Sequence, residues 1–124
     1  MTHGVTRFGL ACALCAPLLS GCEQLNASMP GLNRRSARGV ELASHYGCAS
    51  CHEIPGAPVT GFVGPSLRSV GRRAYLAGAL PNTPEQMTAF IRFPDQARPG
   101  TLMPNLRVSE TDARELVAFL QALR

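Results

Sequence analysis

The chain contains no tryptophan and no lysine, and aromatic residues make up only 6% of its 124 residues. A chain of this length forms one domain at most, and so few aromatic side chains leave that domain a thin apolar core. All twelve basic residues are arginine, and they are scattered along the sequence, which leaves no footprint for nucleic acid. Without residues 1–21, eleven basic and eight acidic residues would remain, a net charge of +3.

Cysteine is too scarce for a disulfide framework. Three of the five cysteines lie within the first 22 residues, and the other two, Cys48 and Cys51, belong to the pentapeptide CASCH at 48–52. No second CxxC or HxxxH pair follows, although structural zinc sites usually combine two such pairs, so the pattern disfavours zinc. No strand-like apolar run lies nearby, which disfavours a thioredoxin-like dithiol.

A CxxCH pattern is the form in which proteins attach a c-type haem. Two thiols about one helical turn apart can reach the two vinyl groups at one edge of a porphyrin, and His52 follows directly as the proximal iron ligand. A buried, largely apolar haem would also supply the core that the polypeptide lacks. The sequence therefore predicts one haem c, bound covalently through Cys48 and Cys51.

Residues 1–21 have the form of an export signal with a lipoprotein-type end. Arg7 precedes an uncharged, mostly apolar segment at 8–19, which is too short for an ordinary transmembrane helix. The letters LSGC at 19–22 resemble a bacterial lipobox, in which Cys22 is acylated, and several acyl chains give stable membrane anchoring. The alternative is ordinary signal cleavage nearby, which would leave Cys22 as an incidental thiol.

The remaining chain divides into a tether and one domain. Residues 22–35 are polar, include Pro30 and Gly31 and lack an apolar stripe, so we expect a lipidated N-terminus and a flexible tether. Residues 36–124 are expected to form an all-α domain of three to five helices, without strands. A short amphipathic helix should lead into Cys48, with His45 on its surface.

Two later helices have clear signals at their ends. The letters TPEQ at 83–86 form a capping box with proline at the first helical position, and Pro94 should end that helix. Met87 lies on its apolar stripe, which indicates core packing rather than iron ligation. Ser109 should cap the last helix, in which Leu116, Phe119, Leu120 and Leu123 form the apolar face and Arg114, Glu115 and Gln121 face water.

Between these helices lie further candidate haem contacts. A carbonyl near Pro65 could accept a hydrogen bond from Nδ1 of His52, which would orient the ring and strengthen its ligation; a simple turn proline is the alternative. Arg72 and Arg73 could each neutralise a haem propionate. Tyr75 could hydrogen-bond a propionate or only pack its ring.

From about residue 39 to the C-terminus the chain resembles the class I c-type cytochromes. The resemblance rests on the CASCH motif at 48–52, the GPSL segment at 64–67 and the PGTLM motif at 99–103. It implies the small all-α cytochrome c fold, with Met103 as distal iron ligand opposite His52 and Thr101 near the propionates. It also implies that Gly39 and Phe119 meet where the first and last helices cross.

The resemblance implies a monohaem electron carrier rather than an enzyme. With the lipobox, we expect a carrier anchored to the membrane on the periplasmic side of a bacterial envelope. Its donor would be a quinol-oxidising complex or a dehydrogenase, and its acceptor a terminal oxidase or reductase. The alternative is a haem enzyme or gas-binding sensor with an open distal site, in which Met103 does not bind the iron or dissociates from it readily. A haem-free metal-binding module is a third, more distant reading.

Overall fold

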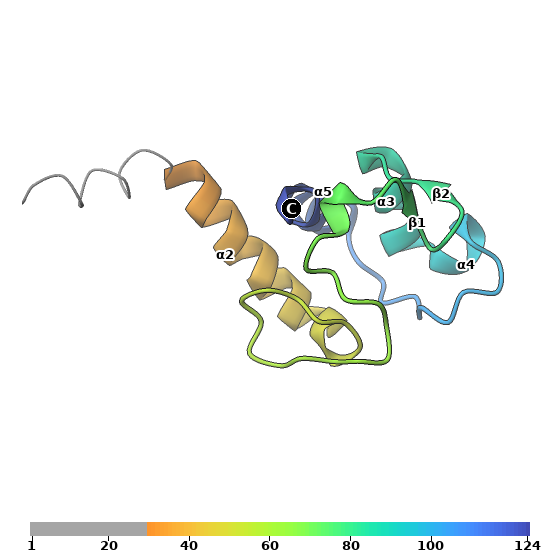
Figure 1. The fold of residues 1–124 in the computed structure, drawn as a ribbon, viewed down its shortest axis with the longest axis horizontal. Helices are drawn as coiled ribbons and strands as arrows, with labels where there is room; N and C mark the ends of the chain where they lie inside the picture. Colours follow the sequence, from red (N-terminus) through yellow and green to blue (C-terminus); the bar gives the residue numbers. More distant parts are fainter. Residues whose placement is uncertain (1–29) are drawn as a thin grey trace, which may run out of the picture. The chain divides into compact units, whose positions relative to one another are not determined.

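The computed structural model describes residues 30–124, with side chains from Arg34 onward, and these residues are mainly helical (Figure 1). The elements are α2 (Pro30–His45), the 3-10 turns η1 (Cys48–Ser50) and η2 (Val70–Arg72), strands β1 (Tyr75–Leu76) and β2 (Leu80–Pro81), and helices α3 (Pro84–Arg92), α4 (Pro94–Ala97) and α5 (Glu110–Ala122). Four α-helices in this part of the chain confirm the all-α prediction. The expected signal peptide, the lipidation site Cys22 and the first part of the tether lie outside the described residues. No helix within 30–124 has the length and apolarity needed to cross a bilayer.

Helix α2 begins at Pro30, whereas the sequence predicted an irregular tether up to residue 35. Proline is compatible with the first turn of a helix, because the N–H that it lacks would have no intrahelical partner there. Residues 34–38 are all exposed, and Gly39 is the first buried position. The helix therefore starts well before the chain reaches the core.

The structure also contains one small hairpin that the sequence did not predict. Strand β1 pairs antiparallel with β2, with Tyr75 opposite Pro81 and Leu76 opposite Leu80. The turn between them uses positive φ at Ala77 (46°) and Gly78 (75°), the conformation that suits a tight hairpin. Strands of two residues are too short to carry an alternating pattern, so periodicity could not reveal them.

The helix signals near 83 and 109 are confirmed. Thr83 Oγ1 accepts a hydrogen bond from the backbone N–H of Gln86 (3.3 Å) at the start of α3, and Ser109 Oγ accepts one from Asp112 (3.1 Å) at the start of α5. Helix α3 ends before Pro94, as expected. Pro94 also opens the short helix α4, which the sequence did not predict, because a first-turn proline fits a new helix.

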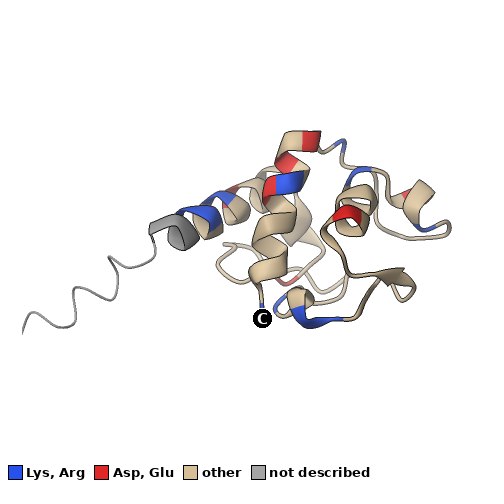
Figure 2. Cartoon of the chain, turned by 90° about the horizontal axis from the view of Figure 1, so that it is seen from above, with Lys and Arg blue, Asp and Glu red and all other residues tan. Residues whose placement is uncertain are grey.

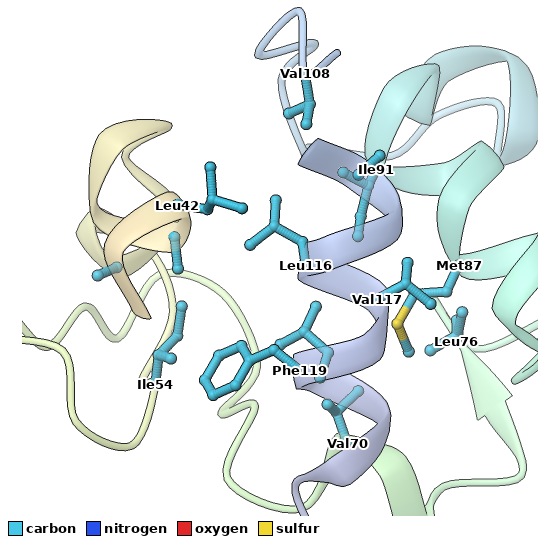
Figure 3. Close-up of a cluster of buried hydrophobic side chains, with 14 residues drawn as sticks. Leu42, Ile54, Val70, Leu76, Met87, Ile91, Val108, Leu116, Val117 and Phe119 are labelled. Atoms are coloured by element: carbon cyan, nitrogen blue, oxygen red, sulfur yellow. The ribbon is translucent and has the colours of Figure 1, made fainter. Parts of the chain in front are cut away.

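Helix α5 forms the centre of the core. Its buried side chains are Ala113, Leu116, Val117, Phe119 and Leu120. Figure 3 shows Leu42 and Ile54 on one side of this helix and Met87 and Ile91 on the other. Met87 is buried among apolar neighbours, as its place on the α3 stripe predicted.

The crossing of α2 with α5 depends on Gly39. A Cβ atom at this position would lie only 2.1 Å from Cγ of Phe119, so no larger residue fits without moving one of the helices. The contact between Gly39 and Phe119 that the resemblance implied is therefore present. It fixes the helix that leads into the CASCH motif against the centre of the core.

Candidate functional site

The CASCH motif forms a compact turn at the end of α2. Gly47, with φ of 74°, ends the helical path, and η1 follows at once. The backbone N–H groups of Cys51 and His52 both donate to the carbonyl of Cys48, at 3.3 and 3.0 Å. Cys48 and Cys51 are three residues apart and so lie on one side of this turn, and His52 follows directly.

His52 is held by the chain segment that follows it. Its Nδ1 lies 2.7 Å from the carbonyl oxygen of Pro65, the partner that the sequence analysis proposed. Because a carbonyl can only accept, Nδ1 carries the proton, and the lone pair of Nε2 stays available for a metal. This hydrogen bond also fixes the orientation of the ring.

Two glycines let the segment wrap closely around the motif. A Cβ at Gly64 would lie 2.4 Å from Cε1 of His52, and one at Gly61 would lie 2.3 Å from the carbonyl oxygen of Ser50. Backbone hydrogen bonds from Gly64 to Cys51 (2.8 Å) and from Gly61 to His52 (3.4 Å) accompany these approaches. The backbone at Gly64 therefore packs directly against the imidazole of His52, and the backbone at Gly61 packs against that of Ser50.

An ion pair closes the same segment. Arg68 Nη2 lies 2.7 Å from Oε1 of Glu53, the residue next to His52. Hydrogen bonds from Ser66 and Arg68 lower the pKa of the Glu53 carboxyl, so it stays ionised through the neutral range. The ends of the segment 53–68 are thus joined beside the candidate ligand.

The two cysteines of the motif are free and half-buried. Burial raises the pKa of the Cys48 thiol, and the nearby Cys51 adds to this effect. At neutral pH Cys48 is therefore held as a neutral thiol in a partly apolar setting. Both thiols remain available for the two thioether bonds.

Met103 lies in a segment without regular structure that runs from Arg98 to α5. Its backbone N–H donates to Oγ1 of Thr101 (3.2 Å), and the N–H of Thr101 donates to the carbonyl of Arg98 (3.1 Å). The Met103 side chain is half-buried and packs against the core, whereas Leu102 beside it is 98% exposed. In this structure Thr101 shapes the loop that presents Met103.

The remaining predicted contacts fall in different places. Arg73 donates from Nη2 to the carbonyl of Ser66, next to the carbonyl that holds His52. Arg72 instead lines a cavity beside the end of α5, with Arg68 and Leu123 among its neighbours. Tyr75, the first residue of β1, is 61% exposed. His45 is exposed, which agrees with its assignment to the surface.

The sequence did not predict the roles of two residues, Asn82 and Arg98, whose side chains donate hydrogen bonds to backbone carbonyls. Asn82 donates from Nδ2 to the carbonyls of Val70 and Arg73 (both 2.8 Å) and accepts from Nε2 of Gln121 (2.8 Å). Gln121 is therefore half-buried and bonded, and its predicted placement toward water is wrong. Asparagine before a helix is an ordinary turn signal, and nothing local indicates partners 9 to 39 residues away.

The second of them is Arg98. It donates from Nε to the carbonyl of Ala77 (3.3 Å) and from Nη1 to that of Pro99 (3.3 Å). The bond to Ala77 joins the loop of Met103 to the turn of the hairpin, and the bond to Pro99 lies within the loop. Arginine at a loop start has no distinctive pattern, so the residues alone gave no reason to select it.

The residues present fit a covalently bound haem. Free cysteines, a histidine with an unengaged Nε2 and a half-buried thioether make up the donor set that haem c requires. Beside these donors lie large apolar side chains without cover, namely Phe62 and Val63 (each 86% exposed) and Leu102. Exposed apolar groups next to Gly64 and Met103 are what a porphyrin contact would leave in the polypeptide alone.

Comparisons with known proteins agree with these features. The family model described as cytochrome c matches residues 36–124. Cytochrome c oxidase subunit 2 of Alkalihalophilus pseudofirmus is 32% identical over 88 residues, which cover 70% of this chain and 25% of that protein. Cytochrome c oxidase subunit 2 of Bacillus subtilis is 31% identical over 94 residues, which cover 70% of this chain and 26% of that protein. The chain thus spans about a quarter of the length of these relatives.

Proposed function

The chain belongs to the cytochrome c family and carries one haem c bound covalently through Cys48 and Cys51, and from this premise we propose that it is a membrane-anchored electron carrier with His52 and Met103 as axial ligands. Haem supplies the one-electron Fe(II)/Fe(III) couple. The observation that carries the assignment of His52 is the 2.7 Å hydrogen bond from its Nδ1 to the carbonyl of Pro65, which leaves Nε2 free.

The chain's own residues prepare both ligands. Pro65 sets the tautomer of His52, and the backbone at Gly64 leaves the ring little room to rotate. Thr101 holds the turn that presents Met103. A soft thioether favours the ferrous state and raises the reduction potential relative to two imidazoles. Two preformed ligands also keep the geometry similar in both oxidation states, which favours rapid electron transfer.

Arg73, rather than Arg72, is the better candidate for a propionate contact. Its guanidinium reaches the carbonyl of Ser66, one residue from Pro65, and Asn82 fixes the backbone of Arg73. Arg72 lines a cavity beside the end of α5, together with Arg68 and Leu123. Of the two arginines, Arg73 therefore contacts the backbone that holds His52, and it can meet an anionic group there. Tyr75 stays a second candidate for the same group.

The partners that we propose are respiratory. The relatives named cytochrome c oxidase subunit 2 support exchange of electrons with a terminal oxidase, although the chain covers only a quarter of them. The donor would be a quinol-oxidising complex or a dehydrogenase. The letters LSGC at 19–22 support acylation of Cys22 and a site on the periplasmic face of a bacterial membrane.

A pair of methionine variants tests the ligand set. Met103→Leu removes the thioether with little change in apolar volume, and Met87→Leu makes the same replacement in the core of α3. We expect oxidised wild-type protein and Met87→Leu to show the far-red iron–thioether absorption band. Met103→Leu should lack the band and bind cyanide or CO rapidly. A Met103→Leu protein that keeps the band would contradict the assignment, and rapid CO binding by the wild type would favour an enzyme or gas sensor.

A further inference from the structure

The outer half of α2 carries three arginines within five residues, Arg34, Arg35 and Arg38, here called the arginine face. At about 100° per residue, the three side chains leave the helix within an arc of about 100°. All three are exposed, and Figure 2 shows them as a basic stretch on the part of α2 that precedes the core. The first buried position, Gly39, comes only after them.

The described domain neutralises only part of this charge. Arg38 lies 2.9 Å from Glu41 and 3.6 Å from Asp112, whereas Arg34 and Arg35 form no ion pair within residues 34–124. The first turn of α2 contains no acidic residue. Cations in the early part of a helix oppose its dipole, and Arg34 and Arg38 repel one another at a spacing of four residues. These charges therefore weaken the helix unless an anion outside the domain binds them.

The position of the arginine face indicates which anion that is. Only residues 23–29 separate Cys22 from α2, and seven residues span at most about 25 Å when fully extended. From Arg34 to His45 the helix rises by about 16 Å, and the chain reaches His52 only beyond that far end. The arginine face thus lies at the end of the domain nearest to the expected anchor and away from the haem ligands.

We propose that the arginine face docks on the anionic phospholipid headgroups of the membrane that holds Cys22. The guanidinium group pairs with phosphate through two parallel hydrogen bonds, which suits arginine better than lysine for this contact. Basic side chains close to an anionic bilayer add to membrane binding, within a screening distance of about 8 Å at physiological salt. The inference rests on the membrane anchor of the proposed function. Its consequence is a domain held in one orientation instead of one that tumbles on its tether.

Acylated holoprotein on vesicles with a trace of fluorescent headgroup-labelled lipid tests this contact. Haem quenches nearby fluorophores, so the quenching reports how close the domain lies to the surface. We expect stronger quenching on equimolar phosphatidylglycerol and phosphatidylcholine than on phosphatidylcholine alone, and reversal by high salt. Arg34→Gln/Arg35→Gln should lower the ratio of docked to undocked protein on the order of tenfold.

The matched control is Arg107→Gln/Arg124→Gln, which removes the same charge from two exposed arginines outside the arginine face. This variant should quench as the wild type does, and both variants should keep the wild-type haem spectrum. Equal quenching on the two vesicle types would overturn the proposal, as would equal losses in the two variants. A slower reaction of Arg34→Gln/Arg35→Gln with a purified redox partner, without any lipid dependence, would assign the face to a protein instead.

Sedimentation with pure phosphatidylcholine vesicles tests the anchor by itself. Protein that sediments with them carries a functional anchor, whatever the arginines do. Protein that sediments only with phosphatidylglycerol vesicles, and loses this binding in Arg34→Gln/Arg35→Gln, lacks the anchor and retains the arginine contact. Failure of the anchor and failure of the arginine contact therefore give different results.

Discussion

The helical frame and the two ligand loops are held together in different ways. The frame of α2, α3 and α5 is closed by buried apolar side chains around α5 and by the contact of Gly39 with Phe119. Within 53–69 only Ile54 and Gly61 are buried, with Ala57 and Leu67 packed against the core, and within 98–108 only Val108 is buried. No hydrogen bond or ion pair joins these two loops in the part of the chain that the structure describes.

The difference indicates which part of the fold the polypeptide stabilises by itself and which part depends on the cofactor. The frame has a core of its own, whereas the loops are held mainly by hydrogen bonds and one ion pair and leave large apolar side chains in solvent. Haem would supply both the missing apolar contacts and the link between His52 and Met103. The loops are thus expected to depend on haem far more than the frame does.

The largest effect is expected from Cys48→Ala/Cys51→Ala, which removes both attachment sites. The loops would then lose their apolar partner, and we expect a protein that melts less sharply and at a much lower temperature than the wild type, without haem staining after denaturing electrophoresis. Ser50→Ala, in the same motif, should keep both properties. A double variant that melts as sharply as the wild type, at the same temperature, would show that the loops do not need haem.

A second variant weakens the frame instead. Gly39→Val forces a branched side chain against Phe119, where even a Cβ would lie at 2.1 Å, and should lower the free energy of unfolding by about 3 kcal/mol. Ser36→Val makes a comparable change at an exposed position of the same helix, and should cost less than about 1 kcal/mol. Chemical denaturation of the holoproteins measures both. Similar losses in the two variants would refute the close crossing.

A smaller effect is expected where the Met103 loop meets the hairpin. Arg98→Gln removes the hydrogen bond from this loop to Ala77 and a second one within the loop, to Pro99, so Met103 should leave the iron more often. We expect cyanide to bind the ferric protein about two- to fivefold faster, which corresponds to one modest hydrogen bond. Arg107→Gln lies in the same loop and its side chain makes no hydrogen bond within the described residues. An equal acceleration in both variants would argue against a specific role for Arg98.

The smallest effect concerns a polar contact within the frame and depends on pH. Hydrogen bonds from Tyr46 and Ser109 lower the pKa of Asp112, so ionised Asp112 favours the folded state. This stabilisation is complete above the pKa that Asp112 has in the unfolded chain and disappears as the pH falls through its lower folded value. Asp112→Asn should therefore melt below the wild type at pH 7, and the two melting temperatures should converge in acid. A constant difference at all pH values would exclude the ionic contribution.

Much of the frame could be predicted from the sequence because its signals are local. Capping residues at Thr83 and Ser109 and the apolar stripe of α5 sufficed to place two helices. The early start of α2 and the hairpin at 75–81 could not be predicted, since neither has a periodic pattern. The hydrogen bonds of Asn82 and Gln121 were missed because they depend on packing between distant segments.

The candidate site likewise contains residues that local sequence signals predict and residues that they do not. The CASCH motif reveals the covalent chemistry by itself, because the spacing of its thiols and the adjacent histidine is local. Met103 lies far from that motif in sequence and emerged only through the resemblance of the PGTLM segment to a known family. The sequence offered no way to rank Arg72 and Arg73 as propionate contacts, because the hydrogen bond from Arg73 to Ser66 depends on how the chain folds between them.

The central claim is that one thioether, that of Met103, lies against the iron opposite His52. A methyl group directly over a porphyrin face is shifted far upfield by the ring current. We therefore expect the NMR spectrum of ferrous protein, labelled with carbon-13 at its methionine methyl groups, to show one strongly upfield-shifted methyl resonance. This resonance should persist in Met87→Leu and vanish in Met103→Leu. A spectrum without such a resonance, or one in which it survives Met103→Leu, would contradict the claim.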